Sequence, residues 1–177
     1  RAFVQPKYQS AAGGRKALFA LDNLWDGIGG LIATDPTVKY LSGKVTIYST
    51  SPEMSRKAMV YYLDMSFGDR EGLITSKNPE TCTPEQAAFF KEMFTGADYK
   101  ENYAILNNYV KSLGDTIPPF IHLYIGLSPT MKTFGTTFDP DFGDCYDTAM
   151  IITAADIYPD KYKRYVESYE KCKVKPA

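Results

Sequence analysis

Apolar residues recur every three or four positions along several stretches of this chain, and that spacing constrains the fold more than any other feature. The spacing is the signature of amphipathic helices, which present one apolar face to a core. In the first stretch, Gly27, Gly29 and Gly30 either let another backbone approach closely or mark fraying of the helix. The stretches cover residues 18–32, 54–65, 87–94, 103–113 and 162–172.

Local start and stop signals indicate where these helices begin and end. Ser51 before Pro52 and Thr83 before Pro84 are typical helix starts, because a hydroxyl can cap the helix and proline suits its first turn. We expect the second helix to end near Gly68 and the fourth to end before the paired prolines at 118–119.

Asp35-Pro36 carries the same start signal and predicts a short helix through Tyr40 and Leu41. Gly43 and the β-branched residues at 45–47 oppose its continuation.

The last third of the chain differs in character. Residues 121–147 are rich in Pro, Gly, Thr and aromatics, which predicts irregular structure, and residues 147–157 predict one short helix. A strand remains an alternative there because Ile151 and Ile152 are β-branched.

Helices therefore dominate the interpretation of the fold. It predicts an all-α protein: an extended N-terminal arm at residues 1–14, an up-down four-helix bundle at 15–120, and a partly irregular C-terminal extension at 121–177 that ends in a helix.

Charge and hydropathy exclude two classes of partner. The 20 basic and 21 acidic residues give a net charge of −1, so no basic excess is present to neutralise a nucleic-acid backbone. No apolar run approaches the roughly 20 residues that a membrane span needs. We expect neither nucleic-acid binding nor a spanning segment.

Candidate catalytic and metal-binding groups are few. His122 is the only histidine and lies among apolar residues in "FIHLYIG", which favours a buried or partner-facing structural role. The turn "DPDFGDCYD" gathers Asp139, Asp141, Asp144 and Asp147, but Gly143 and Met150 stand at the wrong positions for an EF-hand. The sequence thus predicts no catalytic residue, no metal and no cofactor.

The three cysteines fit no zinc pattern. An odd number allows one disulfide and one free thiol, and Cys145 and Cys172 form the more natural pair because both lie in the last third. The alternative is that Cys82, Cys145 and Cys172 are all reduced.

Four segments follow an order that resembles the PsbQ-like extrinsic proteins of photosystem II. They are "GLIATDP", "VKYLSG", "MSRKAMVYYL" and "YKENYAILNNYVKSLGDTIPPF", within residues 15–120. The β-branched "KVTIYSTS" and the long tail beyond Pro119 depart from the family and suit a divergent algal member.

The resemblance implies a non-catalytic subunit on the lumenal face of photosystem II in the chloroplast thylakoid. Such a subunit shields and stabilises the oxygen-evolving centre, binds the core complex and other extrinsic subunits, and is peripheral to the membrane. The oxidising lumen would permit the Cys145–Cys172 disulfide. The arm and two short basic patches are the expected interface with this membrane complex, with contacts from Phe3, Val4, Tyr8, Arg15, Lys16, Arg56 and Lys57.

Two alternatives stay open. One is an accessory helical subunit of another organelle complex, such as a respiratory or NAD(P)H dehydrogenase-like assembly. The other is a pigment-binding or ligand-binding helical protein, in which His122 would be the strongest axial ligand.

Overall fold

The computed structural model describes residues 20–169. Within the described residues the chain divides into two compact units, one formed by residues 20–39 with 157–169 and the other by Tyr40–Asp156. The described part consists of six α-helices and a three-stranded antiparallel sheet, with short 3-10 and π-helical turns. None of the helices within residues 20–169 is long and apolar enough to cross a membrane.

In the smaller unit, α2 (Ala20–Thr34) packs against the π-helical turn Lys163–Glu167, which continues α7 (Pro159–Tyr162). Gly29 lies against this turn, where an added Cβ would be only 2.0 Å from the carbonyl oxygen of Tyr165. A glycine at this position therefore permits close approach of the two backbones.

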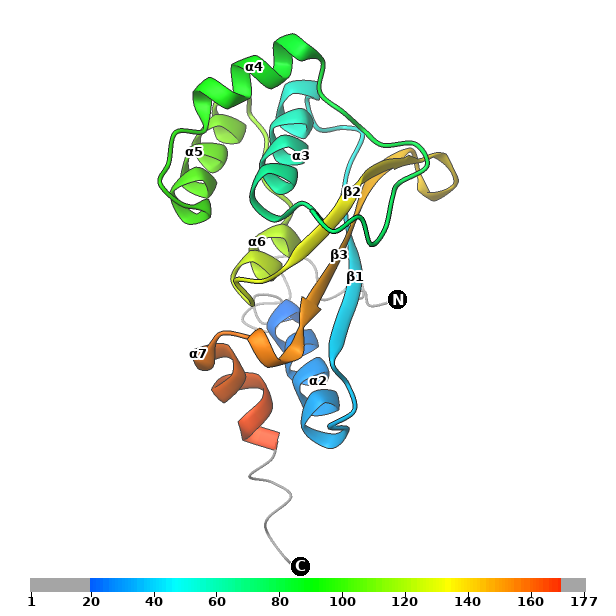
Figure 1. Cartoon of the computed structure of the whole chain (residues 1–177), viewed down its shortest axis with the longest axis vertical. Helices are drawn as coiled ribbons and strands as arrows, with labels where there is room; N and C mark the ends of the chain where they lie inside the picture. Colours follow the sequence, from blue (N-terminus) through cyan, green and yellow to red (C-terminus); the bar gives the residue numbers. More distant parts are fainter. Residues whose placement is uncertain (1–19, 170–177) are drawn as a thin grey trace, which may run out of the picture. The chain divides into compact units, whose positions relative to one another are not determined.

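The larger unit contains the sheet, formed by β1 (Tyr40–Ile47), β2 (Lys132–Asp139) and β3 (Cys145–Thr153) in the order β1-β3-β2 (Figure 1). Strand β1 pairs with β3 over its whole length without a break in register. Strand β2 contains a bulge between Thr133 and Thr136, and Gly135 within it has φ +81°. The bulge therefore uses the conformational freedom of glycine.

The predicted helix through Tyr40 and Leu41 is wrong, because these two residues begin strand β1. Val45 and Ile47 are buried while Lys44 and Thr46 point to the other face, the alternation of a half-buried strand. Asp35 does not start a helix; it accepts hydrogen bonds from the amide and hydroxyl of Thr37 in a turn. The β-branched residues at 45–47, expected to oppose a helix, form part of the strand.

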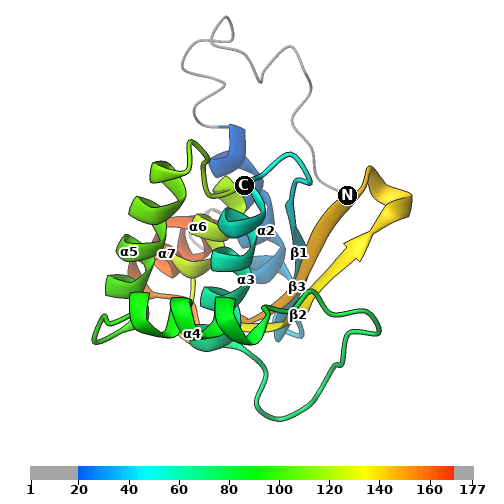
Figure 2. The same ribbon diagram turned by 90° about the horizontal axis from the view of Figure 1, so that it is seen from above.

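Four helices of the larger unit lie on one side of the sheet (Figure 2). They are α3 (Glu53–Phe67), α4 (Pro84–Met93), α5 (Tyr99–Ser112) and α6 (Pro119–Ile125). Thr83 and Gln86 form a capping box at the start of α4, and Asp98 accepts two amide hydrogen bonds at the start of α5. The predicted helices at 54–65, 87–94 and 103–113 are confirmed, with starts close to those expected.

Aromatic side chains fill the space between these helices. Tyr62 is fully buried and its hydroxyl donates to the carbonyl of Tyr99 at 2.8 Å, so its polar end is satisfied inside the core. Burial raises the pKa of Tyr62. The ring of Tyr62 contacts those of Phe67, Phe94 and Tyr103. Tyr61 contacts Phe90 and Phe94 and so extends the cluster.

The all-α prediction and its four-helix bundle are therefore wrong: the fold is mixed α/β. Residues 121–147, expected to be irregular, include most of α6, all of β2 and the start of β3, and residues 147–153, expected to be helical, also belong to β3. The alternative that Ile151 and Ile152 lie in a strand is confirmed, since both belong to β3. The domain boundaries at residues 14 and 120 stay predictions, and the arm at 1–14 lies outside the described residues.

A loop closes the outer edge of β2. We call residues 68–80 the covering loop. It forms isolated bridges at Gly68 with Thr133 and at Pro79 with Thr137. The amide of Asp69 donates to the carbonyl of Thr133 at 2.9 Å. Both ends of the covering loop thus pair with the outer edge of β2.

Candidate functional site

Charged side chains gather at the start of β3, on both faces of the sheet. Tyr146 and Asp147 are neighbours in this strand, so their side chains point to opposite faces. Asp147 is joined by Lys44, Thr46 and Asp139, which we call the Asp147 group. Tyr146 is joined by Arg56, Lys57 and Glu80, which we call the Arg56 group.

The Asp147 group ties the start of β3 to the neighbouring strand β1. Asp147 is 7% exposed and accepts a hydrogen bond from the hydroxyl of Thr46 at 2.6 Å and another from the ammonium of Lys44. Asp139 lies 3.6 Å from the same ammonium, and the ring of Phe142 is 4.5 Å from it. The hydrogen bond from Lys44 to Asp147 raises the pKa of Lys44, so this amine is held as a cation.

The Arg56 group lies on the helix side of the sheet. One carboxylate oxygen of Glu80 is 2.8 Å from Nζ of Lys57 and 3.4 Å from Nε of Arg56. The guanidinium of Arg56 also lies over the ring of Tyr146, 4.1 Å from its centroid. Two cations share one carboxylate here, so the group carries net positive charge and is suited to receive an anionic group such as a carboxylate.

The structure therefore brings together two of the predicted interface residues, Arg56 and Lys57, and places them inside a network. Each of their side chains is only 11% exposed. The other predicted contacts, Phe3, Val4, Tyr8, Arg15 and Lys16, lie outside the described residues. The interface stays a prediction.

Three potential nucleophiles are at least partly buried. Ser55 is fully buried and donates to a carboxylate oxygen of Asp115 at 2.6 Å. Burial raises the pKa of the Cys82 and Cys145 thiols, which disfavours the reactive thiolate. Cys145 is buried and donates to the carbonyl of Phe142. Cys172 lies outside the described residues, so the Cys145–Cys172 disulfide stays a prediction.

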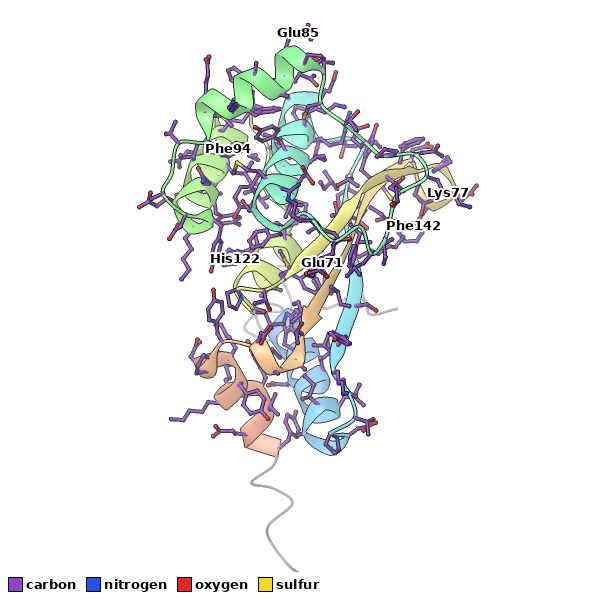
Figure 3. The ribbon with its side chains drawn as sticks, viewed as in Figure 1. Glu71, Lys77, Glu85, Phe94, His122 and Phe142 are labelled. Atoms are coloured by element: carbon purple, nitrogen blue, oxygen red, sulfur yellow. The ribbon has the colours of Figure 1, made fainter. Side chains whose placement is uncertain are left out.

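His122 is exposed on α6, so of its two expected roles, buried or facing a partner, only the second stays a prediction. Its ring is 5.6 Å from that of Tyr103, centroid to centroid. It is far from Phe142, and therefore from the hairpin next to the Asp147 group (Figure 3).

The acidic turn between β2 and β3 has a local structural role. Asp139 accepts a hydrogen bond from the amide of Asp141, while Gly143 and Asp144 adopt positive φ angles of 76° and 50°. In the part of the chain that the structure describes, no group of histidine, cysteine and acidic residues is arranged to hold a metal ion.

Sequence reasoning missed four members of the two groups, Lys44, Thr46, Glu80 and Tyr146, and it named Asp147 only as part of the acidic turn. The alternation in "KVTI" signals a strand that places Lys44 and Thr46 on one face. No comparable local signal joins Glu80 to Arg56, because the contact depends on how the covering loop returns to α3.

Comparison with known proteins supplies two relatives. The chain is 42% identical over 171 residues, 97% of its length, to a glycine Nα-acyltransferase of Phocaeicola vulgatus. It is also 42% identical over 172 residues to a glycine Nα-acyltransferase of Bacteroides thetaiotaomicron. These matches cover 52% and 50% of the relatives, so the chain spans about half the length of the curated relatives it matches. No family model and no solved structure matches.

These relatives correct the predicted identity. The chain is homologous to them over nearly its whole length, whereas the resemblance to PsbQ-like proteins rested on helix order within residues 15–120. The predicted photosystem II family and function are wrong. The thylakoid lumen is also wrong as a location, since both relatives are bacterial. The prediction of a non-catalytic protein is overturned too, because both relatives are named as enzymes. Docking to a membrane protein complex stays an untested prediction.

Proposed function

We propose that this chain takes part in acylating the α-amino group of glycine. The observation that carries the proposal is the 42% identity over 97% of the chain to a protein named for that reaction. Because the chain spans about half of each relative, we propose the relatives' activity for it and do not state that activity as a finding.

The reaction sets clear chemical requirements. The neutral amine of glycine attacks the carbonyl carbon of an activated acyl donor, such as a thioester. The C–N bond forms, the bond to the leaving thiolate breaks, and the proton lost by nitrogen ends on a base or on the departing sulfur. Holding the two reactants in line supplies much of the rate, and an enzyme nucleophile is not required.

Properties of the described residues favour such direct attack. The Ser55 hydroxyl is buried and bonded to Asp115, and burial raises the pKa of both the Cys82 and Cys145 thiols. None of these three is arranged as the activated nucleophile of a covalent mechanism.

The Arg56 group is the part of this chain whose charge suits glycine. Its two cations, Arg56 and Lys57, face the single carboxylate of Glu80, and the Tyr146 ring supports the guanidinium. A planar guanidinium binds a carboxylate through two parallel hydrogen bonds. We therefore assign Arg56 the role of receiving the glycine carboxylate, which would leave the amine free to attack.

The natural gene product, mixed with glycine and an acyl thioester, tests the activity. We expect N-acylglycine by mass spectrometry together with release of one thiol per amide. Thiol release without N-acylglycine, or acylation of alanine as fast as glycine, would count against the proposal.

Arg56→Gln tests the assigned residue. We expect it to raise KM for glycine about tenfold or more, because it removes a charge-assisted hydrogen bond, with a smaller change in kcat. Lys132→Gln, which removes a half-exposed lysine paired with Glu71, is the matched control. An unchanged KM in a folded Arg56→Gln enzyme would overturn the role of Arg56 while leaving the reaction itself intact.

A further inference from the structure

The outer edge of β1 is a row of eight residues of extended backbone. Its inner edge pairs with β3 from Tyr40 opposite Thr153 to Ile47 opposite Tyr146. Among residues 20–169, no strand pairs with its outer edge. Alternate amide and carbonyl groups of β1 therefore point away from the sheet, where another strand can bind them.

The opposite edge of the same sheet shows how this protein closes an edge. The covering loop donates backbone hydrogen bonds to β2 at two points, from Asp69 to Thr133 and from Glu80 to Thr136, the second at 2.7 Å. The hydroxyl of Thr137 adds a bond to the carbonyl of Asn78. The chain thus covers β2 with its own polypeptide, whereas in the described part no strand pairs with the outer edge of β1.

Strand β1 also lacks the features that keep an exposed edge from pairing. Such edges are usually short, bulged, interrupted by proline or marked by a free charge. Strand β1 is longer than the usual five to six residues, and its register with β3 is unbroken. Its single charge, on Lys44, is engaged by Asp147 and Asp139.

Two large aromatic side chains mark the ends of this edge. Tyr40 is 61% exposed and Tyr48 is 65% exposed. Each would gain apolar contact if polypeptide lay along β1, and tyrosine is well suited to such partly wet contacts.

We propose that the outer edge of β1 binds a further β-strand, and that this strand comes from the polypeptide corresponding to the unmatched half of the relatives. The relatives are about twice as long as the stretch that this chain matches. A protein of that length has the material for an extended sheet. Strand addition gives main-chain hydrogen bonds along the whole of β1. This inference concerns the architecture and does not depend on the acyl-transfer proposal.

A photo-crosslinking amino acid in place of Ser42 in the natural gene product tests which polypeptide segment lies along the outer edge of β1. Ser42 is exposed in the middle of β1, and no hydrogen bond of its side chain is seen in the described part. We expect peptide mapping to find a link to sequence that matches the other half of the relatives. The same probe at Lys77, exposed on the covering loop, is the control and should give no such link. A link from Ser42 to residues 40–47 of a second copy, or no link outside residues 1–177, overturns the proposal.

Hydrogen exchange of the unmodified natural gene product provides a second test that needs no substitution. We expect every amide from Leu41 to Thr46 to exchange slowly, including the alternate set that faces away from β3. Fast exchange of that alternate set, or protection that disappears on dilution, would contradict the proposed strand.

Discussion

The two outer strands of the sheet pair with the same central strand, yet their free edges differ. Strand β2 carries a bulge and is covered by residues 68–80, whereas β1 is regular and has no strand on its outer edge within residues 20–169. The difference shows that a chain can close one side of a sheet with a loop and leave the other ready for pairing.

The largest expected effect lies at the closed edge. Glu80→Ala leaves Arg56 and Lys57 without their shared carboxylate in a poorly exposed site. We expect a loss of about 3 kcal/mol in the free energy of unfolding, measured by urea denaturation. Glu71→Ala removes an ion pair whose acidic partner is 64% exposed and should cost no more than about 0.5 kcal/mol. Equal losses for the two variants would show that the Arg56 group does not secure this edge.

A smaller effect is expected on the β1 side. Asp147→Ala leaves the hydroxyl of Thr46 and the ammonium of Lys44 without their main acceptor. We expect a loss of about 2 kcal/mol in the free energy of unfolding. The control is Asp141→Ala, which removes an exposed carboxylate from the turn and should have almost no effect. A loss below about 0.5 kcal/mol for Asp147→Ala would mean that this group does not join β1 to β3.

The smallest effect is a local acid transition in the covering loop. Desolvation raises the pKa of Asp69, but hydrogen bonds from the amides of Glu71, Leu73 and Ile74 outweigh it and leave the pKa below its ordinary value of 3.8. Because the folded pKa is depressed, the stabilisation is present above pH 3.8 and is lost as the pH falls through the lower folded value.

The amide resonance of Leu73 should report this transition in an NMR pH titration, with a midpoint below 3.8. Asp69→Asn should abolish it. A midpoint at or above the ordinary value would show that the carboxylate does not hold this turn.

The helices of the larger unit could be predicted because their signals are local. Thr83 caps α4 through Gln86, three residues away, and Asp98 caps α5 through the next two or three residues. The strands could not be predicted so easily. The bulge at Gly135 breaks the alternation of β2. In β3 the face that carries Ala149 is only partly buried, but both of its faces carry apolar residues, so its sequence lacks the apolar and polar alternation of a half-buried strand.

The site was less predictable than the fold. Arg56 and Lys57 stand out as a basic patch, but the patterns that suggested a docking surface gave no sign of Glu80, more than twenty residues further on. Lys44 and Asp147 are separated by 103 residues and meet only because β1 pairs with β3. Contacts of this kind depend on the register of the sheet and not on any local motif.

Residue-resolved hydrogen exchange on the 177-residue chain tests the contrast between the two edges most directly. The account predicts that the alternate amides of β1 that face away from β3 exchange at least tenfold faster than the amides of Asp69 and Glu80, which bind the edge of β2. Equal protection of the two sets would contradict the account, because it would mean that the edge of β1 is already closed in this chain.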